Sequence, residues 1–350
     1  MKRHRMQLPR EVIVGEGTLD SVTEVFERLG FSESALVVTG HKTMEVAGKT
    51  VIQMLEDRGV KVDSIIVDSS ALREVQMVEA KIREEKPQVV FGIGGGTKID
   101  VAKVSSAYEN VPFISVPTTA SHDGIASPVA SLKGFRKPYS VMAQAPLAII
   151  ADTEIIMKAP KRFSISGCGD VVAKLTAVRD WELAHKVRNE YYGEYAASLA
   201  LMSAQLIMEN AELIKENEEE GLRVLLEALI SCGVAMSIAG SSRPCSGSEH
   251  LFSHALDLTA SKHALHGEQC GVGTIMMAFL HGINWKNVKK TLETLEAPTT
   301  ASDLGITVEE LVRALVEAKK IRPERYTILN EVNMDAHFAE KLAKNTGVIE

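Results

Sequence analysis

Short apolar runs alternate with longer amphipathic stretches over the first 150 residues. The apolar runs are rich in β-branched side chains and predict buried strands at 34–40, 61–68, 88–93 and 111–119. The stretches between them repeat apolar positions with helical spacing and predict helices at 42–59, 75–87 and 98–108. Strands that alternate with helices in this way form a parallel sheet covered by helices. The pattern therefore predicts an α/β, Rossmann-like region.

The pattern changes after residue 152. Helical periodicity prevails from there on, strand-like runs become rare, and residues 191–240 are almost all helix formers. A chain of 350 residues is also too long for most single cores. We therefore predict an α/β domain at 1–152 and an all-α domain at 153–350, with a cleft between them.

Three consecutive glycines end the third predicted strand, in the stretch FGIGGGTKIDVAK at 91–103. A strand, a glycine-rich turn and a helix together aim free backbone N–H groups and the positive helix end at a phosphate. The alternative is a tight turn without a ligand, and the spacing fits neither G-x-G-x-x-G nor the Walker pattern. The polar loop at 117–124 follows the next strand on the same sheet edge, which favours a dinucleotide-binding crevice.

Histidines gather in the predicted helical domain. His250 and His254 are four residues apart and share one helix face, and His263 and His266 follow. Upstream, the sequence places Asp170 at a helix start after two glycines. Two histidines and one carboxylate would leave a metal an open position for catalysis. Such a pair also arises by chance, and His263 competes with His266 for the third position.

Composition narrows the function classes. The net charge of -7 and the pI near 5.9 argue against nucleic-acid binding. No uninterrupted apolar stretch approaches membrane-spanning length, and the basic opening MKRHRMQLPR lacks the apolar region of a secretory signal. The four cysteines lack CxxC spacing. We therefore expect a cytoplasmic protein that does not span a membrane.

Taken together, the two regions resemble the metal-dependent polyol dehydrogenases with the dehydroquinate-synthase-like fold. The motifs that carry the resemblance are the loop from Gly94 to Asp100 and the Asp…His…His order of the metal site. The resemblance covers nearly the whole chain. Within that superfamily, GGGTKIDVAK, VPTTASHDGIASP and SGSEHLFSHALD look most like the sn-glycerol-1-phosphate dehydrogenases. The resemblance implies NAD(P)H-dependent reduction of dihydroxyacetone phosphate to sn-glycerol 1-phosphate, the glycerophosphate backbone of archaeal-type lipids.

The resemblance also assigns roles to single residues. It puts Asp170, His250 and His266 on the metal, with His254 and Asp123 beside the substrate as catalytic groups. Zinc is the family's metal, although ferrous iron suits the same donors. The cofactor-binding positions that it implies are Gly94, Gly95, Gly96, Thr97, Lys98, Asp100, Thr118, Thr119, Ser121 and Ser127.

Three departures refine the assignment. Gly40 stands where many relatives carry an acidic residue that would repel a 2′-phosphate, so we expect NADP to be accepted as well as NAD. The metal carboxylate is an aspartate, Asp170, rather than the glutamate of dehydroquinate synthases, which favours the dehydrogenase branch. Arg243 precedes His250 by seven residues and, with Lys174, is the expected clamp for a substrate phosphate; a surface residue at a helix start is the alternative reading of Arg243.

Two rival functions remain. One is another activity of the same fold, either a glycerol or other polyol dehydrogenase or a sugar-phosphate cyclase. The other is a non-catalytic nucleotide-binding protein with a structural metal, although structural zinc usually has four protein ligands and the sequence offers no such set. In every case we expect a small-molecule ligand, no nucleic acid, and a homo-oligomer.

Overall fold

A parallel six-stranded sheet forms the N-terminal part of the protein. The computed structural model describes residues 6–132, 139–216 and 218–350, so part of the basic opening lies outside the described residues. The strand order is β1-β8-β5-β4-β2-β3, and all neighbours run parallel. The predicted α/β, Rossmann-like architecture is confirmed. The strands are β1 (Glu11–Gly15), β2 (Ser34–Thr39), β3 (Lys61–Ile66), β4 (Val89–Gly94), β5 (Phe113–Pro117) and β8 (Ala148–Asp152).

Two of these strands, β1 and β8, were not predicted. Both are five-residue runs; β1 forms the partly exposed sheet edge, whereas β8 is buried between β1 and β5. β5, which the pattern did predict, has the same length. They extend the sheet by two strands beyond the four that the hydrophobic pattern indicates.

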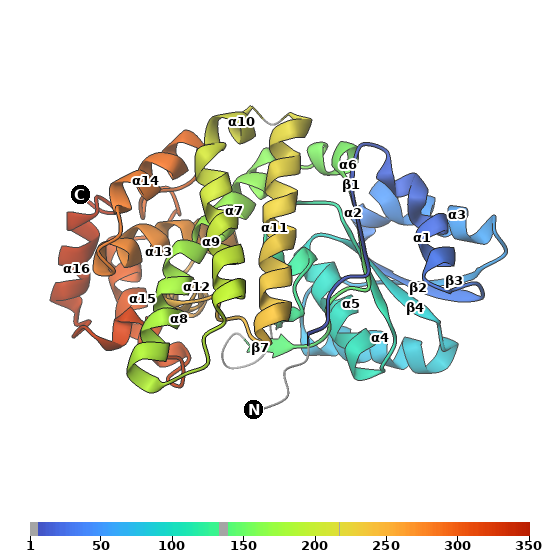
Figure 1. The fold of residues 1–350 in the computed structure, drawn as a ribbon, viewed down its shortest axis with the longest axis horizontal. Coiled ribbons are helices and arrows are strands. Elements are labelled where there is room, and N and C mark those ends of the chain that lie inside the picture. The colour runs from blue at the N-terminus through green and yellow to red at the C-terminus, as the bar shows by residue number, and fades with distance from the viewer. Residues whose placement is uncertain (1–5, 133–138, 217) are drawn as a thin grey trace.

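The sheet separates two hydrophobic clusters. Side chains alternate between the faces, so Leu36 and Val90 belong to one cluster while Val37 and Phe91 belong to the other. Figure 1 shows the covering helices around the sheet. They are α1 (Val22–Arg28), α2 (His41–Thr43), α3 (Lys49–Glu56), α4 (Leu72–Glu85) and α5 (Gly96–Tyr108). The predicted helix at 42–59 contains a π-helical turn over Met44–Gly48.

Short elements complete this part of the chain. One 3₁₀ turn covers Thr18–Ser21, and another, Asp123–Ile125, follows the loop after β5. An antiparallel hairpin pairs β6 (Val129–Leu132) with β7 (Tyr139–Met142).

The rest of the chain is helical, as predicted. The helices are α6 (Thr153–Met157), α7 (Lys161–Val172), α8 (Lys174–Arg188), α9 (Glu194–Glu209), α10 (Ala211–Lys215), α11 (Glu219–Ala239), α12 (Ser248–Thr259), α13 (His266–Leu280), α14 (Trp285–Thr294), α15 (Val308–Ile321) and α16 (Ala336–Asn345), with a 3₁₀ turn at Ile328–Asn330. Because β8 ends at Asp152 and α6 begins at Thr153, strands give way to helices there. The division into two domains at this point stays a prediction.

One expected position is wrong. Asp170 lies in the last turn of α7, not at the start of a helix. The two glycines before it, Gly167 and Gly169, lie inside α7 and do not interrupt it. Each is packed closely against the backbone of another segment. A Cβ on Gly167 would lie 2.1 Å from the carbonyl oxygen of Ala120, and one on Gly169 would lie 2.3 Å from that of Gly267. These glycines let α7 approach its neighbours.

Helix α11 is long and apolar enough to cross a membrane by length and composition alone. However, 67% of its most apolar window is buried inside the protein. Figure 1 shows α11 in the middle of the molecule, between the sheet and the other helices. This placement is that of a core helix.

Candidate active site

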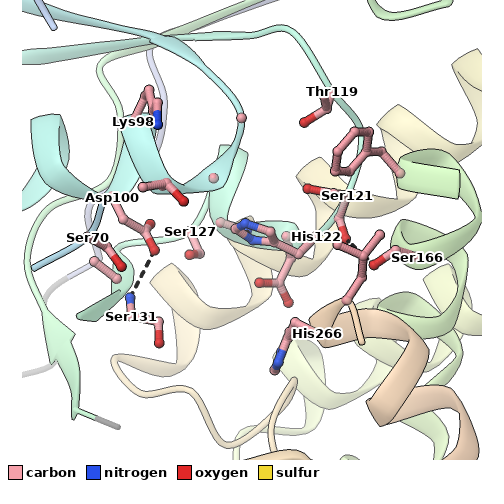
Figure 2. A pocket seen from close by; sticks show the side chains of 18 of the residues that line it. Ser70, Lys98, Asp100, Thr119, Ser121, His122, Ser127, Ser131, Ser166 and His266 are labelled. Atoms are coloured by element: carbon pink, nitrogen blue, oxygen red, sulfur yellow. Dashed lines mark hydrogen bonds between the residues drawn. The ribbon is translucent and has the colours of Figure 1, made fainter. Parts of the chain in front are cut away.

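A cavity of about 660 Å³ joins the carboxyl edge of the sheet to helices α12 and α13. The glycine turn after β4 and the loop after β5 line one end, and His250, His254 and His266 line the other. Figure 2 shows Lys98 and Asp100 on the sheet side and His266 on the helical side. Its sheet end lies where the strand order reverses. From β2 the chain continues to β3 on one side, whereas from the neighbouring β4 it continues to β5 on the other side. Open parallel sheets bind ligands at such points. The two predicted site regions thus open onto one cavity.

The glycine turn has the backbone that a phosphate site needs. Gly94 ends β4 with a φ of 149°, in the region that favours glycine, and Gly95 is the extended N-cap of α5. A Cβ on Gly96 would lie 1.7 Å from Nε2 of His122. The first N–H groups of α5 have no partner within the helix, and only a residue without a side chain fits beneath the His122 ring.

Nine of the ten expected cofactor-binding residues line this cavity; Gly94 does not. The side chains of Asp100, Lys98 and Ser127 already have partners in the protein, and Ser127 donates to the Val129 carbonyl at 3.0 Å. The Asp100 carboxylate accepts hydrogen bonds from Lys103 Nζ at 3.2 Å and from the Ser131 N–H at 2.9 Å (Figure 2). Lys98 donates to the Asp68 carbonyl at 3.1 Å. Asp100 thus holds the β6–β7 hairpin beside the glycine turn.

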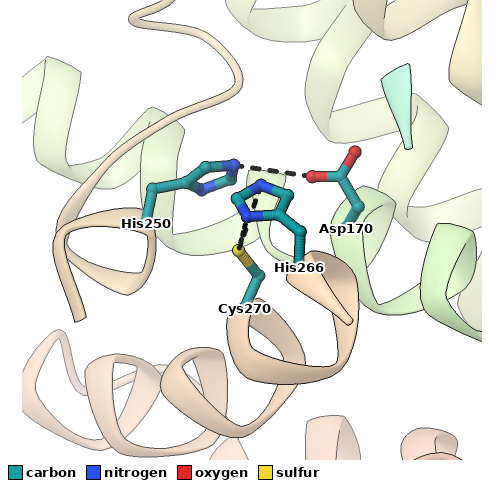
Figure 3. A group of neighbouring side chains, drawn as sticks. All are labelled: Asp170, His250, His266 and Cys270. Atoms are coloured by element: carbon teal, nitrogen blue, oxygen red, sulfur yellow. Dashed lines mark hydrogen bonds and ion pairs between the residues drawn. The ribbon is translucent and has the colours of Figure 1, made fainter. Parts of the chain in front are cut away.

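Asp170, His250 and His266 come together at the helical end of the cavity, and Cys270 joins them (Figure 3). One donor atom from each of the four lies within 4.8 Å of the donor atoms of the others. By contrast, His263 is exposed and lies 3.9 Å from Asp257. Carboxylate, imidazole and thiolate donors suit zinc, so these residues fit a metal. Their role as ligands stays a prediction.

A buried carboxylate orients His250. His250 Nδ1 lies 2.8 Å from Glu249 Oε1, which also accepts the Gly247 N–H at 2.7 Å. Thr176 donates to the other oxygen of Glu249 at 2.8 Å. Because the carboxylate accepts, His250 Nδ1 carries the proton, and Nε2 points to Asp170 Oδ1 at 3.5 Å. A carboxylate behind a histidine is a common support of metal sites.

A second chain of hydrogen bonds orients His266. Ser253 donates its hydroxyl proton to Gln269 Oε1 at 2.7 Å, so its oxygen accepts from His266 Nδ1 at 3.2 Å. Gln269 in turn donates to Asp257 at 3.3 Å. This order fixes the proton on Nδ1 and leaves the Nε2 lone pair beside Cys270, at 3.6 Å from its Sγ. Both histidines therefore present Nε2 to the same space.

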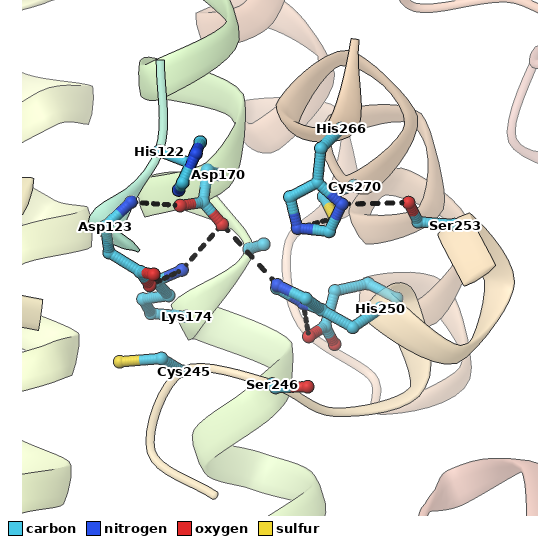
Figure 4. A network of polar contacts seen from close by, with 12 residues as sticks. His122, Asp123, Asp170, Lys174, Cys245, Ser246, His250, Ser253, His266 and Cys270 are labelled. Atoms are coloured by element: carbon cyan, nitrogen blue, oxygen red, sulfur yellow. Dashed lines mark hydrogen bonds and ion pairs between the residues drawn. The ribbon is translucent and has the colours of Figure 1, made fainter. Parts of the chain in front are cut away.

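A buried lysine holds the Asp170 carboxylate. Lys174 Nζ lies 2.8 Å from both Asp170 Oδ1 and Asp123 Oδ2, and the Asp123 N–H donates to Asp170 Oδ2 at 2.9 Å (Figure 4). Burial acts to raise the pKa of Asp170, but Lys174 and His250 outweigh it and hold the pKa well below the usual range. Burial likewise acts to lower the pKa of Lys174, but Asp123 and Asp170 raise it well above its usual range. Asp170 is therefore kept as an anion.

His254 stands apart from the four-donor group but faces the same cavity. Its ring centroid lies 5.9 Å from that of His266, and its buried Nδ1 has no hydrogen-bond partner among the described residues. Burial and the neighbouring His250 lower the pKa of His254 to about 3. His254 is therefore a neutral imidazole, with one nitrogen that can donate a hydrogen bond and one that can accept.

The two expected phosphate-binding residues do not line the cavity. Arg243 is buried, its guanidinium pairs with Glu190, and it donates to the Tyr326 carbonyl at 2.9 Å. Lys174 is fully buried between Asp123 and Asp170. Each cation thus already has protein partners that balance its charge.

Four residues of the site were missed by the sequence analysis: Cys270, Glu249, Ser253 and His122. Cys270 follows His266 by four residues, the same helical spacing that identified His250 and His254. Glu249 is adjacent to His250 in the sequence. The signals for Cys270 and Glu249 were therefore present, whereas the Ser253 and His122 contacts depend on tertiary packing.

Comparison with known proteins identifies relatives over the whole chain. Residues 13–160 match the iron-containing alcohol dehydrogenase family. A Pyrococcus furiosus protein named glycerol-1-phosphate dehydrogenase, NAD(P)+, is 54% identical over 346 residues, 99% of this chain and 100% of the relative. A Methanosarcina mazei protein of the same name is 52% identical, covering 98% and 96%.

Solved structures share the fold at lower identity. Glycerol dehydrogenase from Schizosaccharomyces pombe superposes with a TM-score of 0.80 at 21% identity, covering 100% of this chain and 94% of its own. Sulfoacetaldehyde reductase from Bifidobacterium kashiwanohense, solved with NAD+, gives a TM-score of 0.74 at 17% identity, covering 100% of both chains. The fold is therefore that of the dehydroquinate-synthase-like dehydrogenases, and with 54% identity to a full-length relative the chain belongs to the glycerol-1-phosphate dehydrogenase family.

Proposed function

We propose that this protein reduces dihydroxyacetone phosphate to sn-glycerol 1-phosphate with NADH or NADPH. The supporting observation is that one cavity joins a phosphate-type glycine turn to a metal-type donor group in a chain 54% identical to a glycerol-1-phosphate dehydrogenase. The product would supply the glycerophosphate backbone of archaeal-type membrane lipids. The alternative is glycerol dehydrogenase activity, which interconverts dihydroxyacetone and glycerol, or another polyol dehydrogenase or sugar-phosphate cyclase activity of this fold.

The residues divide the chemistry between the two ends of the cavity. The N–H groups at the start of α5 would bind the cofactor diphosphate, with Thr118, Thr119, Ser121 and Ser127 near the nicotinamide. When bound, the nicotinamide supplies the hydride and the metal supplies a Lewis acid that polarises the substrate carbonyl. Asp170, His250 and His266 would hold that metal.

A proton must also reach the product oxygen. His254 faces the cavity as a neutral imidazole, so it can pass a proton to the product oxygen from one nitrogen while it takes up another from solvent at the second nitrogen. The Asp123 carboxylate is the second candidate, although Lys174 already neutralises it at 2.8 Å. We assign the proton transfer to His254, with Asp123 acting through the Lys174 bridge to hold Asp170 in place.

Zinc is the metal that we propose. Its tetrahedral preference and its acceptance of nitrogen, oxygen and sulfur donors match the group at the cavity. Ferrous iron binds similar donors, so elemental analysis of the purified protein decides between the two. We also propose that the protein is cytoplasmic and forms a homo-oligomer. Light scattering of the purified protein measures its oligomeric state.

The function is tested with dihydroxyacetone phosphate and NADH or NADPH, followed by chiral analysis of the glycerophosphate. We expect net cofactor oxidation and the sn-1 product. Faster turnover with unphosphorylated dihydroxyacetone or glycerol would favour the alternative, and turnover without net cofactor oxidation would indicate a cyclase. Full activity after complete removal of metal would contradict the proposed mechanism.

A further inference from the structure

Cys270 lies within the group of donors that we assign to the metal. It follows His266 by one turn of α13, so the two side chains project from the same face of that helix (Figure 3). Its Sγ lies 3.6 Å from Nε2 of His266, the nitrogen whose lone pair the Ser253 chain leaves available. The family's ligand set of one aspartate and two histidines does not include it.

Two distances in this group match the edges of a tetrahedral site, and all four donor atoms lie within 4.8 Å of one another. Zinc bonds of about 2.0–2.1 Å to nitrogen or oxygen and about 2.3 Å to sulfur separate neighbouring ligands by roughly 3.3–3.6 Å. The Asp170 Oδ1 to His250 Nε2 distance is 3.5 Å, and the His266 Nε2 to Cys270 Sγ distance is 3.6 Å. Two of the six edges therefore have the length that a tetrahedral site requires.

The position of Cys270 is compatible with catalysis. His250 and His266 line the cavity, whereas Cys270 is fully buried and does not. A sulfur ligand on the buried side leaves the cavity side free for a substrate oxygen, as a fifth ligand. Catalytic zinc sites expand to five ligands during reaction.

We propose that the Cys270 thiolate is a fourth protein ligand of the metal, on the side of the site that faces away from the cavity. On binding, the S–H bond breaks, a sulfur–metal bond forms, and the proton leaves to solvent. The thiolate adds a second negative charge beside Asp170 and balances the charge of a divalent ion. A soft sulfur donor also favours zinc over harder metals such as Mn²⁺. The proposal rests on the metal assignment within the proposed function.

Cobalt reports this ligand directly, because a thiolate bound to Co²⁺ gives an intense near-ultraviolet charge-transfer band that nitrogen and oxygen ligands do not give. Metal-free protein is titrated with Co²⁺, together with the variants Cys270→Ser and Cys270→Val. We expect the wild type to bind one Co²⁺ with the charge-transfer band, and both variants to lack that band. The matched control is Cys232→Ser, which removes another fully buried thiol, on α11, and should keep the band.

The outcomes separate this proposal from the one on which it rests. Visible Co²⁺ absorption without the charge-transfer band, or a band that persists in Cys270→Val, would overturn the thiolate ligand and leave the metal assignment intact. Failure of the wild type to bind Co²⁺ would overturn both. Circular dichroism shows whether each variant folds, and the serine variant preserves the size of the side chain. Zinc affinity should fall at least about tenfold in both variants, since even outer-shell losses cost that much, and Mn²⁺ affinity should change less.

Discussion

At the scale of single residues, the choice between His266 and His263 is the most direct test of the metal assignment. His266 lies in the donor group and His263 is exposed beside Asp257. His266→Ala should therefore remove most of the bound metal and nearly all turnover, because it deletes a ligand. His263→Ala is the matched control and should retain both. Elemental analysis measures the metal content of both variants. If His263→Ala lost the metal and His266→Ala kept it, the third ligand would be His263.

His254 gives a prediction for pH. Its pKa is lowered by burial from 6.5 to about 3, so below pH 6.5 the unfolded chain binds a proton that the folded chain does not. The stability that this neutral imidazole contributes is complete above about pH 6.5 and is lost as the pH falls toward 3. Between pH 8 and pH 5, metal-free His254→Asn should therefore lose less unfolding free energy than the wild type.

Urea unfolding of metal-free protein at the two pH values measures this difference. His337→Asn, at an exposed position, is the control and should behave as the wild type. His266 also has a pKa held well below its usual range, first by burial and then by His250, so some pH dependence should persist in His254→Asn. Equal losses in wild type and His254→Asn would show that His254 is not buried as a neutral group.

At the scale of elements, the start of α5 carries the cofactor prediction. Gly95 is the N-cap, and a Cβ there would lie 3.1 Å from Thr119 Oγ1, in the space that the diphosphate would enter. Gly95→Val should weaken NADH binding, because two further methyl groups obstruct the approach to the N–H groups. Fluorescence titration measures the affinity. Metal content should stay unchanged, and unaltered NADH affinity would refute the phosphate-binding turn.

The elements also show what the sequence can and cannot predict. Periodicity gave β2 to β5 and the helices between them, because burial on both faces imposes long apolar runs. It missed β1 and β8, although β5, which it found, has the same length, so strand length alone does not account for the difference. It also placed Asp170 at a helix start, since Gly167 and Gly169 normally interrupt helices, whereas here they allow α7 to touch Ala120 and Gly267.

The site depended on contacts that no local pattern encodes. The resemblance named Asp170, His250 and His266, and the structure brings them together. Cys270 is an exception, because its helical spacing from His266 was visible in the sequence; it was missed because the cysteines were considered only by their spacing from one another. The Asp123–Lys174–Asp170 bridge joins the sheet's loop to two helices, so only the folded chain could reveal it.

At the scale of the whole molecule, the substrate's charge must be met by cations at the helical end of the cavity. Arg243, the residue that the sequence indicated, pairs with Glu190. Arg325 donates instead to Ser242 Oγ at 2.8 Å and to the Ser246 carbonyl, and both serines line the cavity. Burial and the neighbouring Arg322 lower the pKa of Arg325 to about 9, which still leaves it protonated at neutral pH. The C-terminal segment thus brings positive charge behind the cavity wall.

We therefore expect Arg325→Ala to reduce kcat/KM for dihydroxyacetone phosphate more than for uncharged dihydroxyacetone. Arg325 does not itself line the cavity and reaches it through Ser242 and Ser246. The loss should therefore stay below the roughly ten- to hundredfold that a direct charge-assisted contact of about 1.5–3 kcal/mol would give. Arg243→Ala is the matched control: it removes a guanidinium that supports the fold, so both substrates should suffer equally. If Arg243→Ala impaired only the phosphorylated substrate and Arg325→Ala impaired both equally, the phosphate contact would belong to Arg243. A wild type that preferred uncharged dihydroxyacetone would contradict the role of these cations in substrate binding.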